Sequence, residues 1–396
     1  MINFLRKSQL LLLLLLLCPL LNGCWDQREV NDLLYVVAVG IDKPEDVTEN
    51  EQVEVTIQFA IPSNVRGDQT GGMGGGGGKA VEQRTLTGAT IMDAMSKLQQ
   101  ETSRQIFWGH NEVIVIGDRL AKENLHEHID FFARYPEPRL QSRVFIVNGN
   151  AKELLNVDLL LESIPSEKLK DLSSLQVMQD VTLKDFLQKL SKNHRGASAP
   201  LVQKKTTETG DEKLALNGTA ILKNNKMVGS IDAEATRGLL WVLDEIDLAT
   251  VTIQPEKEGK ISFNLIRSRT SLQPVIENGK WKITVSIQTD DDVAENGTNL
   301  NVMSPNTVKN LEILLEKELE KRIYLTLEKV QRGMKADVFN FGDAFHRKYP
   351  KEWSKIKENW EQKFPEVEVK VETNVKVKRP GSSTSPQGIP EEKVEE

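Results

Sequence analysis

The chain has 396 residues, with 51 basic and 58 acidic side chains and a formal net charge of −7. This balance argues against a nucleic-acid partner, because proteins that bind nucleic acid usually display a basic patch. The two cysteines, Cys18 and Cys24, are too few for a disulfide framework. Stability must therefore come from a hydrophobic core, which a chain of this length is able to bury.

The first 24 residues have the parts of a lipoprotein export signal. A short basic start precedes the unbroken leucine run Leu10–Leu17, and small residues lead up to Cys24. The apolar run is too short to span a bilayer, which takes about 20 residues. Leu21-Asn22-Gly23-Cys24 resembles a lipobox. We expect residues 1–23 to be removed by cleavage between Gly23 and Cys24, and the Cys24 thiol to carry diacylglycerol with fatty acyl chains such as palmitate.

Such an anchor makes a transmembrane helix unnecessary. Two acyl chains hold a protein stably on a membrane, whereas one chain binds only marginally. No second run of about 18 apolar residues follows Cys24. The sequence therefore predicts a mature chain without a membrane-spanning helix, tethered to membrane lipid through Cys24 on the extracytoplasmic face.

Residues 24–195 alternate between strand-like and helix-like patterns. Apolar runs or period-two alternation predict strands at residues 35–41, 53–59, 113–116 and 143–147, and helical spacing predicts helices at 90–100 and 120–135. The tract Gly71–Gly78 predicts a flexible tip. From residue 151 to 192 the pattern is helical, with Thr182 as an N-cap. This order of elements indicates a mixed α/β domain.

The next segments suggest a boundary and a second unit. Small residues with proline, then polar and charged residues, indicate a linker at 196–213. Residues 214–258 predict a small middle domain with a hairpin and a helix, because Asn224 and Asn225 tolerate left-handed turn geometry.

Residues 259–379 predict a C-terminal α/β domain. Strands are expected at 261–267 and 281–288, a long helix at 305–331, and a final strand from residue 367. The polar segment 380–396 is expected to be disordered. The predicted fold class is α+β or mixed α/β, with three domains and mixed sheets flanked by helices.

The long helix has two distinct faces. Leu311, Leu315 and Leu319 belong to an apolar stripe, and the other face is dense in Glu and Lys. Packing of the stripe onto the protein's own sheet is favoured over a coiled-coil partner. The polar face is either solvated or a contact surface, with a set of glutamates as the candidate interaction residues: Glu312, Glu316 and Glu320.

Few residues have a pattern that suggests chemistry. His126 and His128 lie two apart on a predicted helix, so their rings should diverge rather than share a metal ion. His110 and Asn111, at the entrance to a strand, either bond backbone groups in a turn or form a contact site. Asp290–Asp292 either bind a hard cation or lie in a solvated loop, which is favoured. We expect no catalytic residue, metal or cofactor, because the usual catalytic motifs are missing from the sequence.

Several segments form a pattern that extends from Cys24 to about Lys378. They are Gly23–Asp26, Arg28–Leu33, Val39–Asp42, Gly109–Glu112, Asn217–Ala220, Asp337–Asp343, Tyr349–Trp353 and Trp360. No segment is specific alone, but in their order and spacing they resemble the Ger(x)C family, the lipoprotein C subunits of the nutrient receptors that trigger bacterial spore germination.

The resemblance implies a three-domain mixed α/β lipoprotein on the outer surface of the inner spore membrane. It would assemble with a membrane-embedded A subunit and a transporter-like B subunit, and no catalytic residue is transferred by the resemblance. Phe341, Trp353 and Trp360 are expected to be core aromatics, and Gly342 a cap or turn. The alternatives are a solute-binding lipoprotein of a membrane transporter and a lipoprotein enzyme. Dissimilar halves and an aromatic content of 6% argue against the solute-binding protein.

Overall fold

A computed structural model describes residues 32–46, 48, 51–61, 81–157, 164–175, 178–191, 196–255, 259–379, 390 and 394–395. Gly23, Cys24 and the tract Gly71–Gly78 lie outside these residues, as does most of the tail. Within the described part of the chain, no helix combines the length and the apolar character needed to cross a bilayer.

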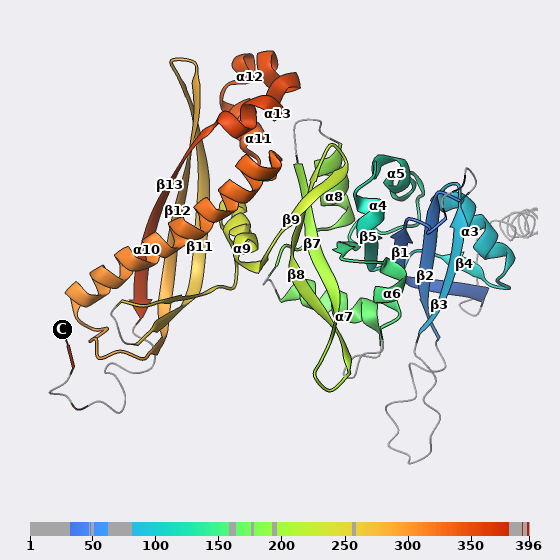
Figure 1. Cartoon of the computed structure of the whole chain (residues 1–396), viewed down its shortest axis with the longest axis horizontal. Helices are drawn as coiled ribbons and strands as arrows, with labels where there is room; N and C mark the ends of the chain where they lie inside the picture. Colours follow the sequence, from blue (N-terminus) through green and yellow to red (C-terminus); the bar gives the residue numbers. More distant parts are fainter. Residues whose placement is uncertain are drawn as a thin grey trace, which may run out of the picture.

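The first of the two sheets has nine strands within the described ranges (Figure 1). Its order is β3-β2-β1-β5-β6-β7-β8-β9, and β4 pairs with β1. The centre, β1-β5-β6-β7, is parallel, whereas the flanking pairs are antiparallel. The strands are β1 (Leu33–Asp42), β2 (Val53–Ala60), β3 (Val81–Gly88), β4 (Gln105–Phe107), β5 (Val113–Gly117), β6 (Arg143–Val147), β7 (Gly196–Thr206), β8 (Glu212–Lys223) and β9 (Lys226–Ile231).

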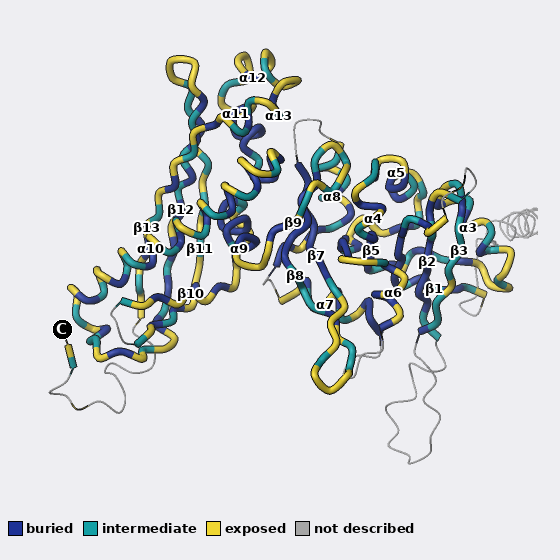
Figure 2. The backbone as a smooth tube through the Cα atoms, viewed as in Figure 1, coloured by how far each residue is buried: buried dark blue, intermediate teal, exposed yellow. Residues whose placement is uncertain are grey.

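Helices cover both faces of this sheet. In β5, Ile114 and Ile116 pack in one core with α3 (Ile91–Gln100), α4 (Asp118–Ala121), α5 (His126–Arg134) and α8 (Leu183–Leu190). Val113 and Val115 pack in a second core with α6 (Ala151–Leu155) and α7 (Pro165–Ser174). The continuous apolar runs of the central strands follow from burial on both sides, and Figure 2 shows these strands buried along most of their length.

The second sheet has the order β10-β11-β12-β13. Helix α10 crosses one face of it diagonally (Figure 1), and its leucine stripe lies in the core with the sheet. The predicted packing of the long helix on its own sheet is therefore confirmed. The elements of this half are α9 (Ala233–Leu243), β10 (Thr250–Ile253), β11 (Ile261–Glu277), β12 (Lys280–Asn296), α10 (Pro305–Leu327), the π-helix η3 (Glu328–Met334), α11 (Phe341–Lys348), α12 (Pro350–Ile356), η4 (Lys357–Asn359), α13 (Trp360–Lys363), η5 (Phe364–Glu366) and β13 (Glu368–Arg379).

The predicted linker at residues 196–213 is wrong. Gly196–Thr206 forms β7, and Glu212 already belongs to β8, so the segment lies inside the nine-stranded sheet. Small residues and Pro200 suggested a loop, but Gly196–Pro200 is fully buried. Small side chains suit a strand that lies close under neighbouring elements, and the strand accommodates Pro200 next to an irregularity in its pairing with β8.

The predicted middle domain, residues 214–258, has no sheet of its own. Its hairpin, β8 and β9, completes the first sheet, whereas α9 and β10 pack with the second sheet. The turn itself is confirmed, since Asn224 and Asn225 have positive φ values of 51° and 61°. How many units fold independently stays a prediction.

Two further predictions differ from the structure. Asp290–Asp292 lies within β12 rather than in a loop, because β11 and β12 pair along nearly their whole 17-residue length. In the tail, Glu395 is described and bonds the backbone of Asn299 and Asn301, at N···O distances of 2.8 and 2.7 Å. The expectation of disorder therefore fails at this residue.

Candidate functional site

The segment Gly109–Glu112 is a turn that joins β4 to β5, as expected. Asn111 is fully buried, and Ser142 Oγ donates to its carbonyl oxygen at 2.6 Å. The backbone nitrogen of Asn111 donates to the carbonyl oxygen of Trp108 at 2.9 Å. Asn111 therefore holds the turn in place and is not accessible to a partner.

His110 in the same turn is exposed. Its ring packs edge-on against Tyr35 and Phe107, with centroids 5.0 and 6.1 Å away. Gly109 makes this arrangement possible, because a Cβ there would come within 2.4 Å of the Phe107 ring. Tyr35, Phe107 and His110 form a partly exposed aromatic group near the start of β1.

The glutamates of α10 are not on a free polar face. Glu312 accepts a hydrogen bond from the backbone nitrogen of Val377 at 3.1 Å, and Glu316 accepts one from Val375 at 3.2 Å. Glu320 accepts from the hydroxyl of Thr373 at 3.0 Å. These three half-buried side chains bond to β13, so they do not form a freely solvated face; their contact with a partner stays a prediction.

Asp337 organises the motif Asp337–Asp343. Its buried carboxylate accepts from the backbone nitrogens of Phe341 and Gly342, at 3.1 and 2.7 Å, and from Trp360 Nε1 at 2.9 Å. A Cβ on Gly342 would lie 2.9 Å from the Trp353 ring and 3.0 Å from Trp360 Nε1. The aromatic residues are therefore core residues, as predicted, and the glycine is required by close packing at the start of α11.

A second segment that carries the family resemblance, Asn217–Ala220, lies where the two halves of the molecule pack together. Gly218 has φ +112°, and a Cβ there would lie 1.9 Å from the carbonyl oxygen of Ile231. Thr219 shares a hydrogen bond with Thr236 of α9 at 3.0 Å. The segment Asn217–Ala220 thus serves packing between the first sheet and the first helix of the second half.

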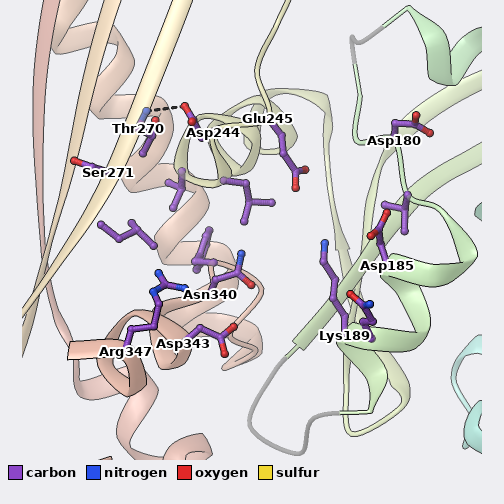
Figure 3. Close-up of a pocket in the computed structure, with 16 residues that line it drawn as sticks. Asp180, Asp185, Lys189, Asp244, Glu245, Thr270, Ser271, Asn340, Asp343 and Arg347 are labelled. Carbon is purple, nitrogen blue, oxygen red and sulfur yellow. Dashed lines mark hydrogen bonds between the residues drawn. The ribbon is translucent and has the colours of Figure 1, made fainter. Parts of the chain in front are cut away.

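A cleft of about 650 Å³ lies between the halves (Figure 3). Charged residues of α8 line one side, and residues of α11 and the end of α9 line the other. Several of its acids already have partners: Arg143 binds Asp180 with two bonds of 3.0 Å, and Gln179 donates to Glu245 at 3.0 Å. The charged and amide residues of the lining are Asp180, Asp185, Gln188, Lys189, Asp244, Glu245, Asn340, Asp343 and Arg347.

Two buried aspartates have raised pKa values, and one of them, Asp291, belongs to the segment Asp290–Asp292 that the sequence singled out. Burial raises the pKa of Asp42 to about 6, although its carboxylate accepts from the backbone nitrogens of Ala151 and Lys152 at 2.7 and 2.9 Å. Burial also raises the pKa of Asp291 to about 6; its carboxylate accepts from Thr289 Oγ1 at 2.6 Å. Asp42 ends β1 opposite Glu54 of β2, and Asp291 lies within β12 opposite Leu265 and Val377. The local sequence pattern did not reveal that either carboxyl is buried.

The two histidines lie on different sides of α5, as their spacing predicts, but only His126 lies on a solvated face. His128 is buried on α5, and burial lowers its pKa, whereas His126 is exposed. Among the described residues, no group of three or more His, Cys, Asp or Glu side chains is arranged to hold a metal ion.

Comparison with known proteins places both halves in one family. The spore germination protein N-terminal domain matches residues 26–204, and the domain described as spore germination B3/GerAC like, C-terminal, matches residues 217–381. The chain belongs to the Ger(x)C family of spore germination proteins.

Individual spore germination proteins are similar in sequence to this chain over nearly their full length. The chain is 27% identical to spore germination protein KC of Bacillus subtilis, covering 96% of this chain and 98% of that protein. It is 28% identical to spore germination protein B3 of the same organism, covering 94% and 96%. The crystal structure of the GerBC protein is similar in fold, with a TM-score of 0.58, 23% identity and coverage of 86% and 96%.

Proposed function

We propose that this chain is the lipid-anchored C subunit of a nutrient germinant receptor, which acts through protein contacts rather than catalysis. The observation that supports it most strongly is that both halves match spore germination domains in the expected order. The non-catalytic role is supported by the motif residues Asp337, Gly342 and Trp360, which bond and pack against one another in the core.

The anchor is the first part to test. Cys24→Ala should abolish incorporation of labelled fatty acid and leave the precursor uncleaved at Gly23, because the thiol is the group that is alkylated. Cys18→Ala is the matched control and should be processed normally, since Cys18 leaves with the signal. Equal labelling of the Cys24→Ala chain would remove the lipoprotein assignment.

The second part is assembly on the inner spore membrane with the A and B subunits. Purification of the tagged chain from spore membranes in mild detergent should recover both integral-membrane subunits. Recovery of an ATP-driven permease instead would favour the solute-binding alternative. The cleft between the halves gives that alternative little support, because ligand pockets are mostly apolar and aromatic, whereas this one is lined chiefly by charged and polar side chains.

The partly exposed aromatic group of Tyr35, Phe107 and His110 is the contact surface that we propose in place of the α10 glutamates. Aromatic side chains are common at the energetic centres of interfaces, and His110 is exposed beside Tyr35 and Phe107. His110→Ala should reduce recovery of the partners without changing the melting temperature. His126→Ala removes another exposed histidine and serves as the control; equal losses in both variants would contradict this assignment.

A further inference from the structure

The outer edge of β13 is closed by one helix. β13 is the last strand of its sheet, with β12 on one side. The unpaired N–H and C=O groups of such an edge invite another strand to pair with it. Here the backbone nitrogens of Val375 and Val377 donate to Glu316 and Glu312 of α10, and Val371 donates to the Tyr324 hydroxyl oxygen at 3.2 Å.

The four hydrogen bonds between α10 and β13 form a regular series, which we call the ladder, because the bonded residues are spaced similarly along the helix and along the strand. Successive helix residues of the ladder are four positions apart, which is about 6 Å along the axis at a rise of about 1.5 Å per residue. They are Tyr324, Glu320, Glu316 and Glu312. Their partners on β13 are spaced two apart, which is about 6.6 Å along a strand. The Glu320 rung differs only in that it accepts from the Thr373 hydroxyl. Because the two rises are nearly equal, one helix face follows the strand over four successive rungs.

We propose that this ladder is an edge guard that keeps the second sheet from pairing with a second copy of the chain through β13. Natural proteins protect such edges because an open edge leads to self-association. β13 is 12 residues long and forms one continuous edge, whereas the other edge is divided between β10, which has four residues, and the part of β11 beyond its pairing with β10.

The charges on β13 favour one pairing with a second copy. In an antiparallel pair with two-fold symmetry about Asn374, Glu372 of each copy lies opposite Lys376 of the other. On the core face, Val371 then lies opposite Val377 and Thr373 opposite Val375. Moving the axis by two residues places Glu372 opposite Glu372, or Lys376 opposite Lys376, which is unfavourable.

Lys376 takes part in the guard as well. Its ammonium group lies 3.4 Å from Glu312 in the ladder. Removal of Glu312 would therefore free both the backbone N–H of Val377 and the charge that Glu372 of a second copy would meet. Removal of Glu312 thus opens the edge of β13 at Val377 and also leaves Lys376 available to pair with Glu372 of the second copy.

The pairing predicts a specific cross-link. Asn374 is a non-hydrogen-bonded position in the expected pair, where opposite Cα atoms are about 4.5 Å apart. That distance is within the range of about 4.4–6.8 Å that a disulfide accepts. Asn374→Cys should thus report the paired state as a disulfide dimer after mild oxidation.

The experiment places Asn374→Cys in the full chain, purified in detergent, with a native ladder or with Glu312→Ala/Glu316→Ala/Glu320→Ala. We expect about tenfold tighter self-association in the open-edge variant, seen as cross-linked dimer and as a shift in light scattering. Each background without Asn374→Cys corrects for disulfides of Cys18 or Cys24. Lys309→Ala/Lys317→Ala changes exposed residues of α10 and should leave the dimer fraction at its native level.

A matched triple variant separates hydrogen bonding from charge. Glu312→Gln/Glu316→Gln/Glu320→Gln keeps an acceptor oxygen at every rung and should stay close to the native dimer fraction. The proposal is overturned if the folded alanine variant shows no more cross-linked dimer than the chain with the native ladder. Should the triple alanine chain not fold, Glu316→Ala alone opens one of the two middle rungs, and the same outcome decides.

Discussion

The two halves protect their sheets in different ways. The nine-stranded sheet is covered by helices on both faces, so its central strands are held by apolar area on either side. In the second sheet, alternate residues of β11, β12 and β13 are buried against the helices, and those between them are largely polar and more exposed. In this half, buried hydrogen bonds at Asp337 and partly buried ones along α10 also help to fix the position of the helices.

The largest expected effect tests the hydrogen bonds at Asp337. Asp337→Ala leaves three buried donors, at Phe341, Gly342 and Trp360, without their carboxylate. Because each such loss costs about 1–3 kcal/mol and the costs are not fully additive, we expect the free energy of unfolding to fall by about 3–5 kcal/mol. Chemical denaturation measures the change, and Asp337→Asn, which keeps one acceptor oxygen, should lose less.

A substitution in the first sheet gives a reference value for the loss in free energy of unfolding. Ile116→Val removes one methyl group from a core that is supported on both faces, and should cost about 1 kcal/mol. If Asp337→Ala costs no more than Ile116→Val, the comparison between the halves is incorrect.

The seam between the halves should tolerate change poorly at one glycine. Gly218→Ala places a Cβ 1.9 Å from the carbonyl oxygen of Ile231. Backbone must then move, and we expect a loss of about 2–4 kcal/mol. Gly210→Ala also has a positive φ, of +90°, but nothing lies within 4 Å of its Cβ. Gly210→Ala should lower the free energy of unfolding by about 1 kcal/mol. Comparing the melting temperatures of the two variants separates the effect of the steric clash at Gly218 from that of the positive φ.

The two buried aspartates should respond differently to substitution by the uncharged asparagine. The Asp291 carboxyl has a pKa of about 6 when folded, against 3.8 for an ordinary side chain. Between pH 4 and 6 the folded state therefore binds more protons, and its stability falls as the pH rises. Asp291→Asn should gain about 1–3 kcal/mol at pH 7 and nothing below pH 4.

Asp42→Asn is the counterpart in the first sheet. Asp42 also has a folded pKa of about 6, but both of its oxygens accept backbone N–H groups. An amide would direct its own N–H at one of those donors, which offsets the gain. Denaturation at pH 4 and 7 should show stabilisation for Asp291→Asn alone; equal gains would mean that burial outweighs hydrogen bonding in both halves.

The smallest expected effect is at an ion pair between the halves. Lys223 of β8 lies 3.4 Å from Glu361 of α13, and both side chains are partly exposed. Lys223→Ala should lower the free energy of unfolding by less than about 1 kcal/mol, and the difference should shrink at high salt. A larger, salt-independent loss would show that the halves are coupled more strongly through this contact than exposure suggests.

Prediction from the sequence succeeded where the signal was local. The buried strand at Val113–Gly117, the capping threonine Thr182 and the Asn224–Asn225 turn were recovered, since each depends on neighbouring residues. The Thr182 hydroxyl accepts from the backbone nitrogen of Asp185 at 3.2 Å, as an N-cap should. The aromatic core of the C-terminal motif was also foreseen, although from a resemblance rather than from periodicity.

Prediction failed where a residue's environment is made by distant parts of the chain. Gly196–Pro200 looked like a loop because small residues and proline are locally poor strand formers, yet β8 pairs with them across a sheet. Glu312, Glu316 and Glu320 were expected on the side of α10 away from the leucine stripe, but each follows a stripe leucine by one position and so flanks the stripe. Nothing in the helix itself reveals that an unpaired strand edge, some 60 residues later, lies beside them.

The sequence by itself therefore determined the class of fold, the periodic faces of its strands and helices, and the turn of its β8–β9 hairpin, because backbone and side-chain preferences act over a few residues. Only the tertiary structure decided which strands share a sheet, that Asp337 joins α11 to Trp360, and that α10 closes the edge of β13. These depend on groups that become neighbours only when the chain folds, where unsatisfied buried or edge polar groups select their partners by position rather than by sequence.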